Sequence, residues 1–144
     1  MMAKWLWWVL LPVLSSAVYA AEIRPYGEQN CVYQGEVNKS AKPEGMGAWS
    51  CHDGRVYTGH FKNGMFEGHG SYVVPDRSGL VLNPFGGMNS EKLLGMTIEG
   101  TFHHNQADGV LVASKNGEQQ LLLKFEHGQL ASVNVPKVKK SRKK

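Results

Sequence analysis

A short stretch in the middle of the chain alternates apolar and polar positions in a way that predicts a β-hairpin. Residues 57–62 read YTGHFK, in which aromatic or glycine positions alternate with polar ones, as in a strand with one buried face. Asn63-Gly64 follows, a pair that tolerates positive φ at a hairpin turn. Gly68 and Gly70 fall on the expected return strand, where the missing side chain allows a neighbouring ring or backbone to approach closely.

The same phrase recurs along the chain. Its copies start at Tyr33, Tyr57, Ile98 and Leu121, which are separated by 24, 41 and 23 residues. A nearly fixed period marks a repeat architecture, in which each hairpin becomes stable by pairing with the next. We therefore expect an all-β fold, a single antiparallel sheet of three to four consecutive hairpins. It spans residues 31–132, with an insertion at about 78–95, between a short segment at 21–30 and a disordered tail at 133–144.

The second copy, YTGHFKNGMFEGHG, resembles the MORN repeat, whose form is YxGxFxxGxxxGxG, at every position. The first copy has Val37 in place of the Phe and Ser40 in place of the turn Gly. In the third, Ile98 replaces the Tyr and Leu111 replaces the last Gly. The fourth keeps the Phe and the turn Gly alone. The resemblance implies a scaffolding, dimerising or membrane-apposing role.

The first hairpin allows a register to be predicted. If Gly35 faces Gly47, then Tyr33 faces Trp49 and Cys31 faces Cys51. Directly opposed strand residues come within disulfide reach. The bridge would close a loop of 20 residues and stabilise the fold by about 3 kcal/mol. Two free buried thiols are the alternative.

The N-terminus has the features of a secretory signal peptide. Lys4 precedes an apolar run from Trp5 to Leu14, and small residues lead to Ala20. The run is about half of the roughly 20 residues that a membrane span needs. We expect a signal peptide helix at 1–20, cleavage after Ala20, no transmembrane span afterwards, and a secreted, periplasmic protein. An uncleaved N-terminal anchor is the alternative.

Charge is concentrated at the C-terminus, where six of the sixteen basic residues occupy the last eight positions. Without these six and Lys4, the rest of the chain has nine basic and twelve acidic residues and is mildly acidic. Its charge gives no sign of a nucleic-acid partner. A block of like charges is usually solvated. It also has the character of an attachment site for an anionic lipid or envelope surface. That site would consist of Lys137, Lys139, Lys140, Arg142, Lys143 and Lys144.

The insertion contains turn chemistry around an apolar cluster, Leu80, Val81, Leu82 and Phe85. One interpretation is a long hairpin extension, or a short helix near residues 90–94, that folds over the sheet. The other is a binding loop that carries Phe85 and Met88, because insertions in repeat proteins often lie on the binding face.

Motifs for catalysis and for metal binding are sparse. The sequence has no CxxC, GxSxG, HExxH or phosphate-cradling GxxxxGK[ST] pattern. In the second hairpin the register places His60 opposite His69, but a third ligand is not evident, so we expect neither a metal site nor a cofactor. Glu44, Glu67 and Asp108 recur beside a glycine, which favours hydrogen bonding at turns over acid–base chemistry. We expect no enzymatic activity.

The sequence therefore favours an exported interaction or scaffold module that binds a protein or lipid partner through an aromatic sheet face. The same aromatic residues could equally form the core. An open edge near 121–125 suggests a homodimer. The second functional hypothesis is an envelope- or membrane-surface protein attached through the basic tail. The expected face consists of Tyr33, Trp49, Tyr57, Phe61, Tyr72 and Phe102.

Overall fold

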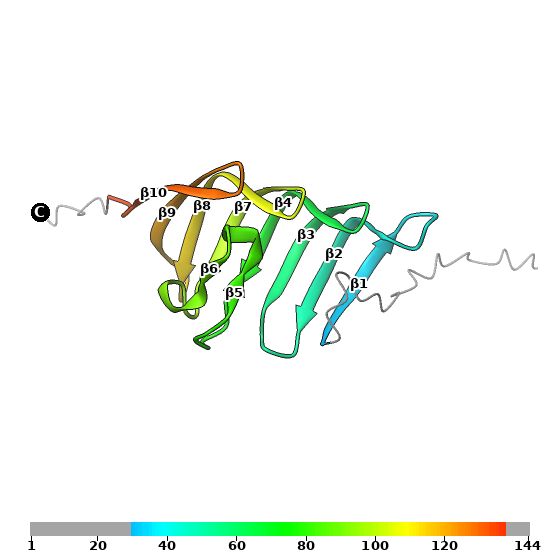
Figure 1. Cartoon of the computed structure of the whole chain (residues 1–144), viewed down its shortest axis with the longest axis horizontal. Coiled ribbons are helices and arrows are strands. Elements are labelled where there is room, and N and C mark those ends of the chain that lie inside the picture. The colour runs from blue at the N-terminus through cyan, green and yellow to red at the C-terminus, as the bar shows by residue number, and fades with distance from the viewer. Residues whose placement is uncertain (1–29, 138–144) are drawn as a thin grey trace, which may run out of the picture.

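The computed structural model describes residues 30–137, which form an antiparallel sheet of eight strands in chain order. The expected signal peptide, the segment at 21–29 and tail residues 138–144 lie outside the described residues. The strands follow one another along the long axis of the molecule (Figure 1). They are β1 (Cys31–Val37), β2 (Pro43–Cys51), β3 (Val56–Lys62), β4 (Met65–Val73), β7 (Thr97–His103), β8 (Gln106–Lys115), β9 (Glu118–Glu126) and β10 (Gln129–Asn134).

Four hairpins make up this sheet, β1–β2, β3–β4, β7–β8 and β9–β10, as the repeat spacing predicts. One row of paired residues crosses seven strands, so the starts of the repeats occupy matching positions. Its members are Tyr33, Trp49, Tyr57, Tyr72, Ile98, Ala113 and Leu121. The predicted all-β class and the register of the first hairpin are confirmed.

Cys31 is paired with Cys51 in the sheet, and the two form a disulfide, as predicted. The bridge lies at the end of the first hairpin, where β1 has a partner strand on one side only. Such a bond is typical of proteins that fold in an oxidising, extracytoplasmic compartment. Within residues 30–137, no helix is long and apolar enough to cross a membrane.

A row of glycines runs beside the aromatic row, and the tyrosine rings lie on it. Gly35, Gly47, Gly59, Gly70 and Gly100 are paired in succession across five strands. A Cβ atom at Gly47 would overlap the ring of Tyr33, and one at Gly70 would overlap the ring of Tyr57. These two glycines are thus required for close approach, which is how the rings come to be fully buried on a single sheet.

The hydroxyls of Tyr33 and Tyr57 are each satisfied by a β-bulge of their own repeat. The pairing shifts between Gly35 and Val37 and again between Gly59 and Phe61. At these bulges Tyr33 Oη donates to the carbonyl of Glu36 at 2.6 Å, and Tyr57 Oη donates to the carbonyl of His60 at 2.9 Å. A bulge frees backbone groups from the ladder, so the buried phenol gains an acceptor three residues along the chain.

Turns of successive repeats are joined by a carboxylate. Glu44 Oε2 accepts from the backbone N–H of Asn63 at 2.9 Å, in the turn of the next hairpin. Glu67 Oε2 accepts from the backbone N–H of His104 at 2.8 Å in the same way. The predicted turn hydrogen bonding of these carboxylates is therefore present, but it links neighbouring repeats. We call this arrangement the turn clasp, defined by Glu44 with Asn63 and Glu67 with His104.

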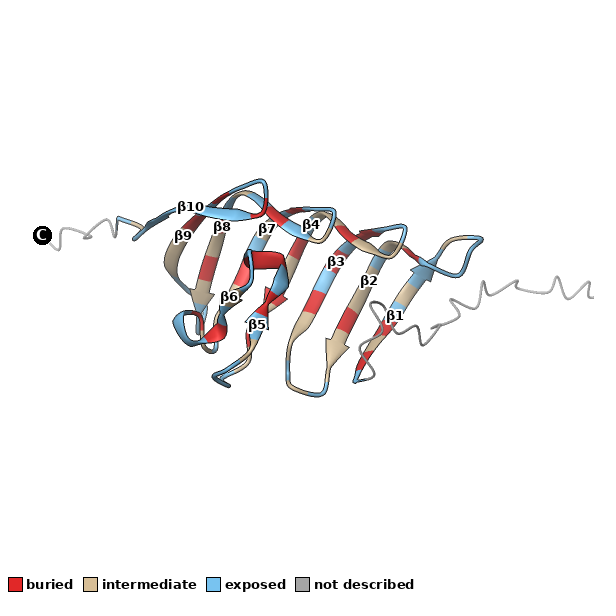
Figure 2. Cartoon of the chain, in the orientation of Figure 1, coloured by how far each residue is buried: buried red, intermediate tan, exposed pale blue. Residues whose placement is uncertain are grey.

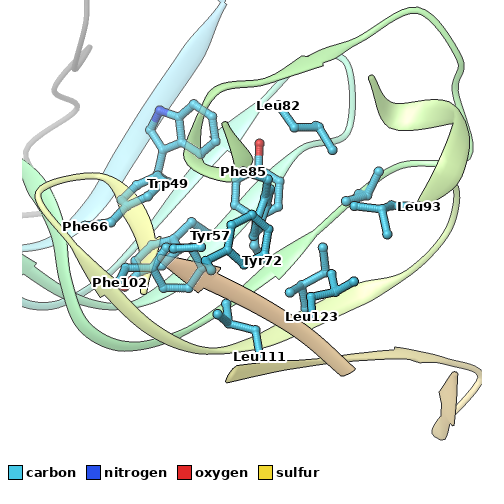
Figure 3. Close-up of a cluster of buried hydrophobic side chains, with 14 of the residues drawn as sticks. Trp49, Tyr57, Phe66, Tyr72, Leu82, Phe85, Leu93, Phe102, Leu111 and Leu123 are labelled. Carbon is cyan, nitrogen blue, oxygen red and sulfur yellow. The ribbon is translucent and has the colours of Figure 1, made fainter. Parts of the chain in front are cut away.

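The insertion folds over the sheet, as one of its two interpretations predicts. It forms a two-stranded hairpin of β5 (Val81–Leu82) and β6 (Met88–Asn89), with the single turns η2 (Asn83–Phe85) and η3 (Ser90–Lys92). The hairpin lies in front of β4 and β7 in Figure 1. Leu82 and Leu93 of the insertion are fully buried in the common core, and Figure 3 shows them in one cluster with the rings of the sheet. The apolar cluster thus supplies the second layer of the fold.

The core is a chain of aromatic rings under this layer. Phe66 is central: its ring stacks on Tyr57 at 3.8 Å and lies edge-on to Trp49 and Phe102 at 5.5 and 6.1 Å. Buried positions alternate with exposed ones along the strands, as Figure 2 shows. The alternation read from the sequence is therefore the inside–outside pattern of the sheet.

The open edge is not where the sequence placed it. Residues 121–125 lie on β9, which pairs with both β8 and β10. A short final hairpin adds β10 as the edge strand, and its six residues are all exposed. Leu130 and Val133 are among the exposed large apolar residues.

Tyr33 gives the fold a dependence on alkaline pH. Burial, with the Glu36 carboxylate acting in the same direction, raises the pKa of Tyr33 from 10.0 to about 12. The folded state then holds a proton that the unfolded chain releases, so its stability is complete below about pH 10 and falls from about pH 10 to about 12. Urea unfolding should show this fall, and Tyr33→Phe should make it shallower. An equal fall in both proteins would contradict the assignment.

Candidate functional site

A cavity of about 370 Å³ lies between the insertion and the sheet. Its aromatic wall comes from β2 and β4, which contribute Trp49, Phe66 and Tyr72. The insertion contributes Asn83 and Pro84 of η2. Turn residues between β7 and β8 close the third side. Segments distant in sequence therefore converge here because the insertion folds back over the repeats.

Trp49 lines this cavity and carries an indole N–H without a hydrogen-bond acceptor among the described residues. Its side chain is buried, with only 4% of the residue exposed, and its ring lies 5.5 Å from Phe66 and 6.3 Å from Tyr72. Its Nε1 atom is buried and has no hydrogen-bond partner among the described residues. A buried indole N–H usually finds an acceptor. Trp49 therefore contributes its ring to the apolar wall and carries a donor with no acceptor among the described residues.

Arg55 lies over the indole at the same site. Its guanidinium is 5.5 Å from the centre of the Trp49 ring, a cation–π distance. Arg55 Nε donates to Asp53 Oδ2 at 2.8 Å, and the backbone N–H of Arg55 donates to Asp53 Oδ1 at 3.0 Å. The ion pair holds the arginine across the ring and offsets its charge. The wall around Trp49 is thus fixed before any ligand arrives.

The third wall is polar. His104, Asn105 and Gln106 line the cavity from the turn and the start of β8. The Asn105 side chain is held in place, since its Oδ1 accepts from the backbone N–H of Phe66 at 2.8 Å. A site with one apolar wall and one amide-rich wall suits a ligand that combines an apolar group with peptide-like polar groups.

The six aromatic residues expected on an exposed face are instead buried, at 0–4% exposure. The cause is physical: the rings of Tyr33 and Tyr57 lie on the glycine row, the rings pack edge to face on one another, and the insertion covers part of them. Trp49 and Tyr72 line the cavity. The remaining four do not line the cavity. They are core residues, as the alternative interpretation of the aromatic positions expects. They are Tyr33, Tyr57, Phe61 and Phe102.

The two insertion residues expected in a binding loop also face inward. Phe85 is 1% exposed, and its ring lies 5.1 Å from Tyr72 and 5.7 Å from Phe125. Figure 3 shows Phe85 beside Tyr72 within the cluster. Met88 is half-buried and packs against the same core. Their neighbour Pro84 lines the cavity, which the sequence alone does not reveal.

The expected pairing of His60 with His69 is wrong. A bulge shifts the register between Gly59 and Phe61, so His60 has no paired residue on β4, and His69 is paired with Thr101 on β7. A different cluster forms instead, in which ligand atoms of Glu67, His103 and His104 lie within 4.8 Å of one another. The sequence does not reveal this cluster because its members come from two hairpins, which the pairing of β4 with β7 and the turn clasp bring together.

Glu67 is held ionised in this cluster. The backbone N–H of His104 donates to its carboxylate and lowers the pKa of Glu67, and the side chain of His103 acts in the same direction. Glu67 Oε1 and His103 Nδ1 are 2.7 Å apart.

Of the basic tail residues, Lys137 is described and exposed, while the other five lie beyond the described part of the chain.

Comparison with known proteins gives a partial similarity. No family model matches the chain. A segment of 39 residues, 27% of this chain, is 44% identical to part of Alsin from Rattus norvegicus. The same length is 41% identical in Alsin from Mus musculus and from Homo sapiens. The matched segment spans 2% of the length of those proteins, so the similarity is local.

Proposed function

We propose that this protein is an exported, non-catalytic interaction module of the MORN-repeat type. It binds an extended segment of a partner protein in the cavity lined by Trp49. The observation that carries the proposal is Trp49, a residue that lines the cavity and whose buried Nε1 has no acceptor among the described residues. A peptide carbonyl is the natural acceptor for such a donor.

The cavity has the size and composition for one or two side chains of a peptide. Its volume of about 370 Å³ falls within the range of about 300–1,000 Å³ that is usual for ligand sites. Trp49 and Phe66, with Tyr72 behind them, give the cavity an apolar wall suited to a proline or aliphatic side chain. The amides of Asn83 and Gln106 can both donate and accept, as an extended backbone requires. The combination of apolar rings with amide side chains favours a peptide over a lipid chain as the ligand.

Export and a periplasmic location are part of the proposal. The disulfide between Cys31 and Cys51 supports it, because such bonds persist in oxidising compartments. The signal-like N-terminus of the sequence supports it as well. The repeat phrase and its regular hairpins support the MORN-type assignment, with scaffolding as the corresponding role.

Peptide binding can be measured through Trp49 itself. The other tryptophans are Trp5, Trp7 and Trp8, and changing these three to phenylalanine leaves Trp49 as the sole indole. Peptides selected on the full chain from a displayed random library should shift the emission of Trp49. Trp49→Phe replaces the indole with a smaller phenyl ring and removes both the N–H and the fluorophore, so its binding is measured by calorimetry. It should weaken binding by at least about three- to tenfold, the value of one net hydrogen bond.

Two controls locate the binding. Thr58→Ala alters an exposed polar position on β3 that is absent from the cavity lining and should leave affinity unchanged. Loss of residues 137–144 should also leave it unchanged, since attachment through the tail is the competing hypothesis. Peptides that bind Trp49→Phe and the original protein equally, or that require the tail, would contradict the proposed site.

A further inference from the structure

Two imidazoles and a carboxylate come together at the second turn clasp. Glu67 extends from β4, His103 is the last residue of β7, and His104 begins the turn between β7 and β8. One ligand atom from each side chain lies within 4.8 Å of the others. Nitrogen and carboxylate oxygen donors in this combination are typical ligands of Zn²⁺ and related first-row divalent ions.

The backbone that carries these side chains is already fixed. His104 has φ of 46° and Asn105 has φ of 69°, the left-handed conformations of a tight hairpin turn. The backbone N–H of His104 orients Glu67 through its Oε2 atom, and the backbone N–H of Asn105 donates to the carbonyl of Phe66 at 3.0 Å. Glu67 Oε1 remains directed at His103. The clasp thus supplies the outer hydrogen bond that orients a metal-binding carboxylate.

We propose that Glu67, His103 and His104 form a binding site for a divalent transition-metal ion of the zinc class. The ion would take the place of the proton between Glu67 Oε1 and His103 Nδ1, which are 2.7 Å apart. Zinc–ligand bonds of about 2.0–2.2 Å place tetrahedral ligand atoms about 3.3–3.5 Å from one another. The pair must therefore open by less than about 1 Å.

Both imidazoles have room for this adjustment. The rings of His103 and His104 are stacked at 4.1 Å with 18° between their planes, so each must turn to direct a nitrogen at one ion. The His103 side chain is 60% exposed and His104 is an exposed residue, so rotation displaces solvent and no core contact. Solvent would fill the fourth coordination position, as in zinc sites with three protein ligands.

The site is separate from the peptide-binding proposal although His104 also lines the cavity. Its ligands come from β4, the end of β7 and the turn after it, and the donor of the peptide site is the indole of Trp49. Loss of zinc binding would leave the indole donor in place, and loss of the indole N–H would leave the three ligands in place. Each proposal can therefore fail alone.

Calorimetric titration with Zn²⁺ alone tests the site. The oxidised full chain, without a histidine tag and freed of metal, should bind one equivalent. His103→Asn and His104→Asn should each weaken binding at least tenfold. Asparagine tolerates positive φ, and His104→Asn keeps the backbone N–H that binds Glu67, so the turn clasp is preserved. Glu67→Gln should have a similar effect, with unchanged near-UV circular dichroism confirming folding.

His60→Asn and His69→Asn are the matched controls, because they remove imidazoles that lie outside the cluster. Zinc binding should survive both changes. Binding below about a tenth of an equivalent, or an equal loss in the control variants and the ligand variants, would overturn the proposal. Unchanged affinity in both His103→Asn and His104→Asn would overturn it as well.

Discussion

Replacing Phe66 with alanine is expected to lower the free energy of unfolding by about 3–5 kcal/mol, the usual cost of truncating a buried aromatic side chain. Phe66 is 3% exposed, stacks on Tyr57, and lies edge-on to Phe61 and Phe102. The ring joins the second and third hairpins and also lines the Trp49 cavity. Its removal leaves a void at the junction of the repeats that the sheet cannot close.

Urea unfolding followed by circular dichroism would measure this loss. Val110→Ala is a suitable control, since Val110 is 58% exposed on β8, and its truncation should cost less than about 0.5 kcal/mol. If Phe66→Ala proved as mild as Val110→Ala, the ring cluster would not be the core of the fold.

The pairing of the strands could be predicted from the sequence because it depends on local chemistry that repeats. Alternation around Tyr57 fixes which face is buried, and Asn63-Gly64 fixes the turn. Once Gly35 faces Gly47, the positions of Cys31 and Cys51 follow without further assumption, and the disulfide occurs there. Each of these inferences depends on spacing within one hairpin.

Features that depend on bulges or on contact between hairpins could not be predicted. The bulge after Gly59 moves His60 away from its expected partner His69. The strict alternation of apolar and polar residues in this strand does not indicate a bulge. The contact of Glu67 with the next turn bridges 37 residues and crosses the insertion. The same limit applies to the cavity, where Pro84 meets Trp49 only because the insertion folds back.

Whether the aromatics are core or surface was the point that sequence left open. An aromatic residue on an alternating strand fits either a buried or a ligand-facing position. The distinction depends on what covers the face, and here the cover is the insertion together with the rings themselves. The apolar cluster at Leu82 and Phe85 was the available signal, since a solvated loop does not require it.

The third repeat shows why the tyrosine and the glycine belong together. Tyr33 lies on Gly47 and Tyr57 lies on Gly70. In the third repeat Ile98 takes the tyrosine position and Leu111 takes the position of the last glycine, and both are fully buried. The combination of a large tyrosine and a glycine without a side chain is thus replaced by two aliphatic side chains of middle size. The two combinations have the same number of side-chain heavy atoms, so the position stays filled, as a close-packed core requires.

Replacing Gly70 with alanine is the second change with a large expected effect, a loss of about 3 kcal/mol, at the upper end of the cost of overpacking. The added Cβ would overlap the ring of Tyr57, which is fully buried between Phe61, Phe66 and Phe102. The ring has no free space into which it can move. Chemical unfolding of the oxidised protein would report the loss.

A double-mutant cycle between Tyr57 and Gly70 tests the central claim, that each repeat packs by matching these two positions. Tyr57→Ile installs the residue of the third repeat, and Gly70→Ala should then cost little or even stabilise the protein. The predicted coupling energy is about 1.5–3 kcal/mol, within the range of residues in direct contact. A cost of Gly70→Ala that is the same with tyrosine and with isoleucine at position 57 would contradict the account.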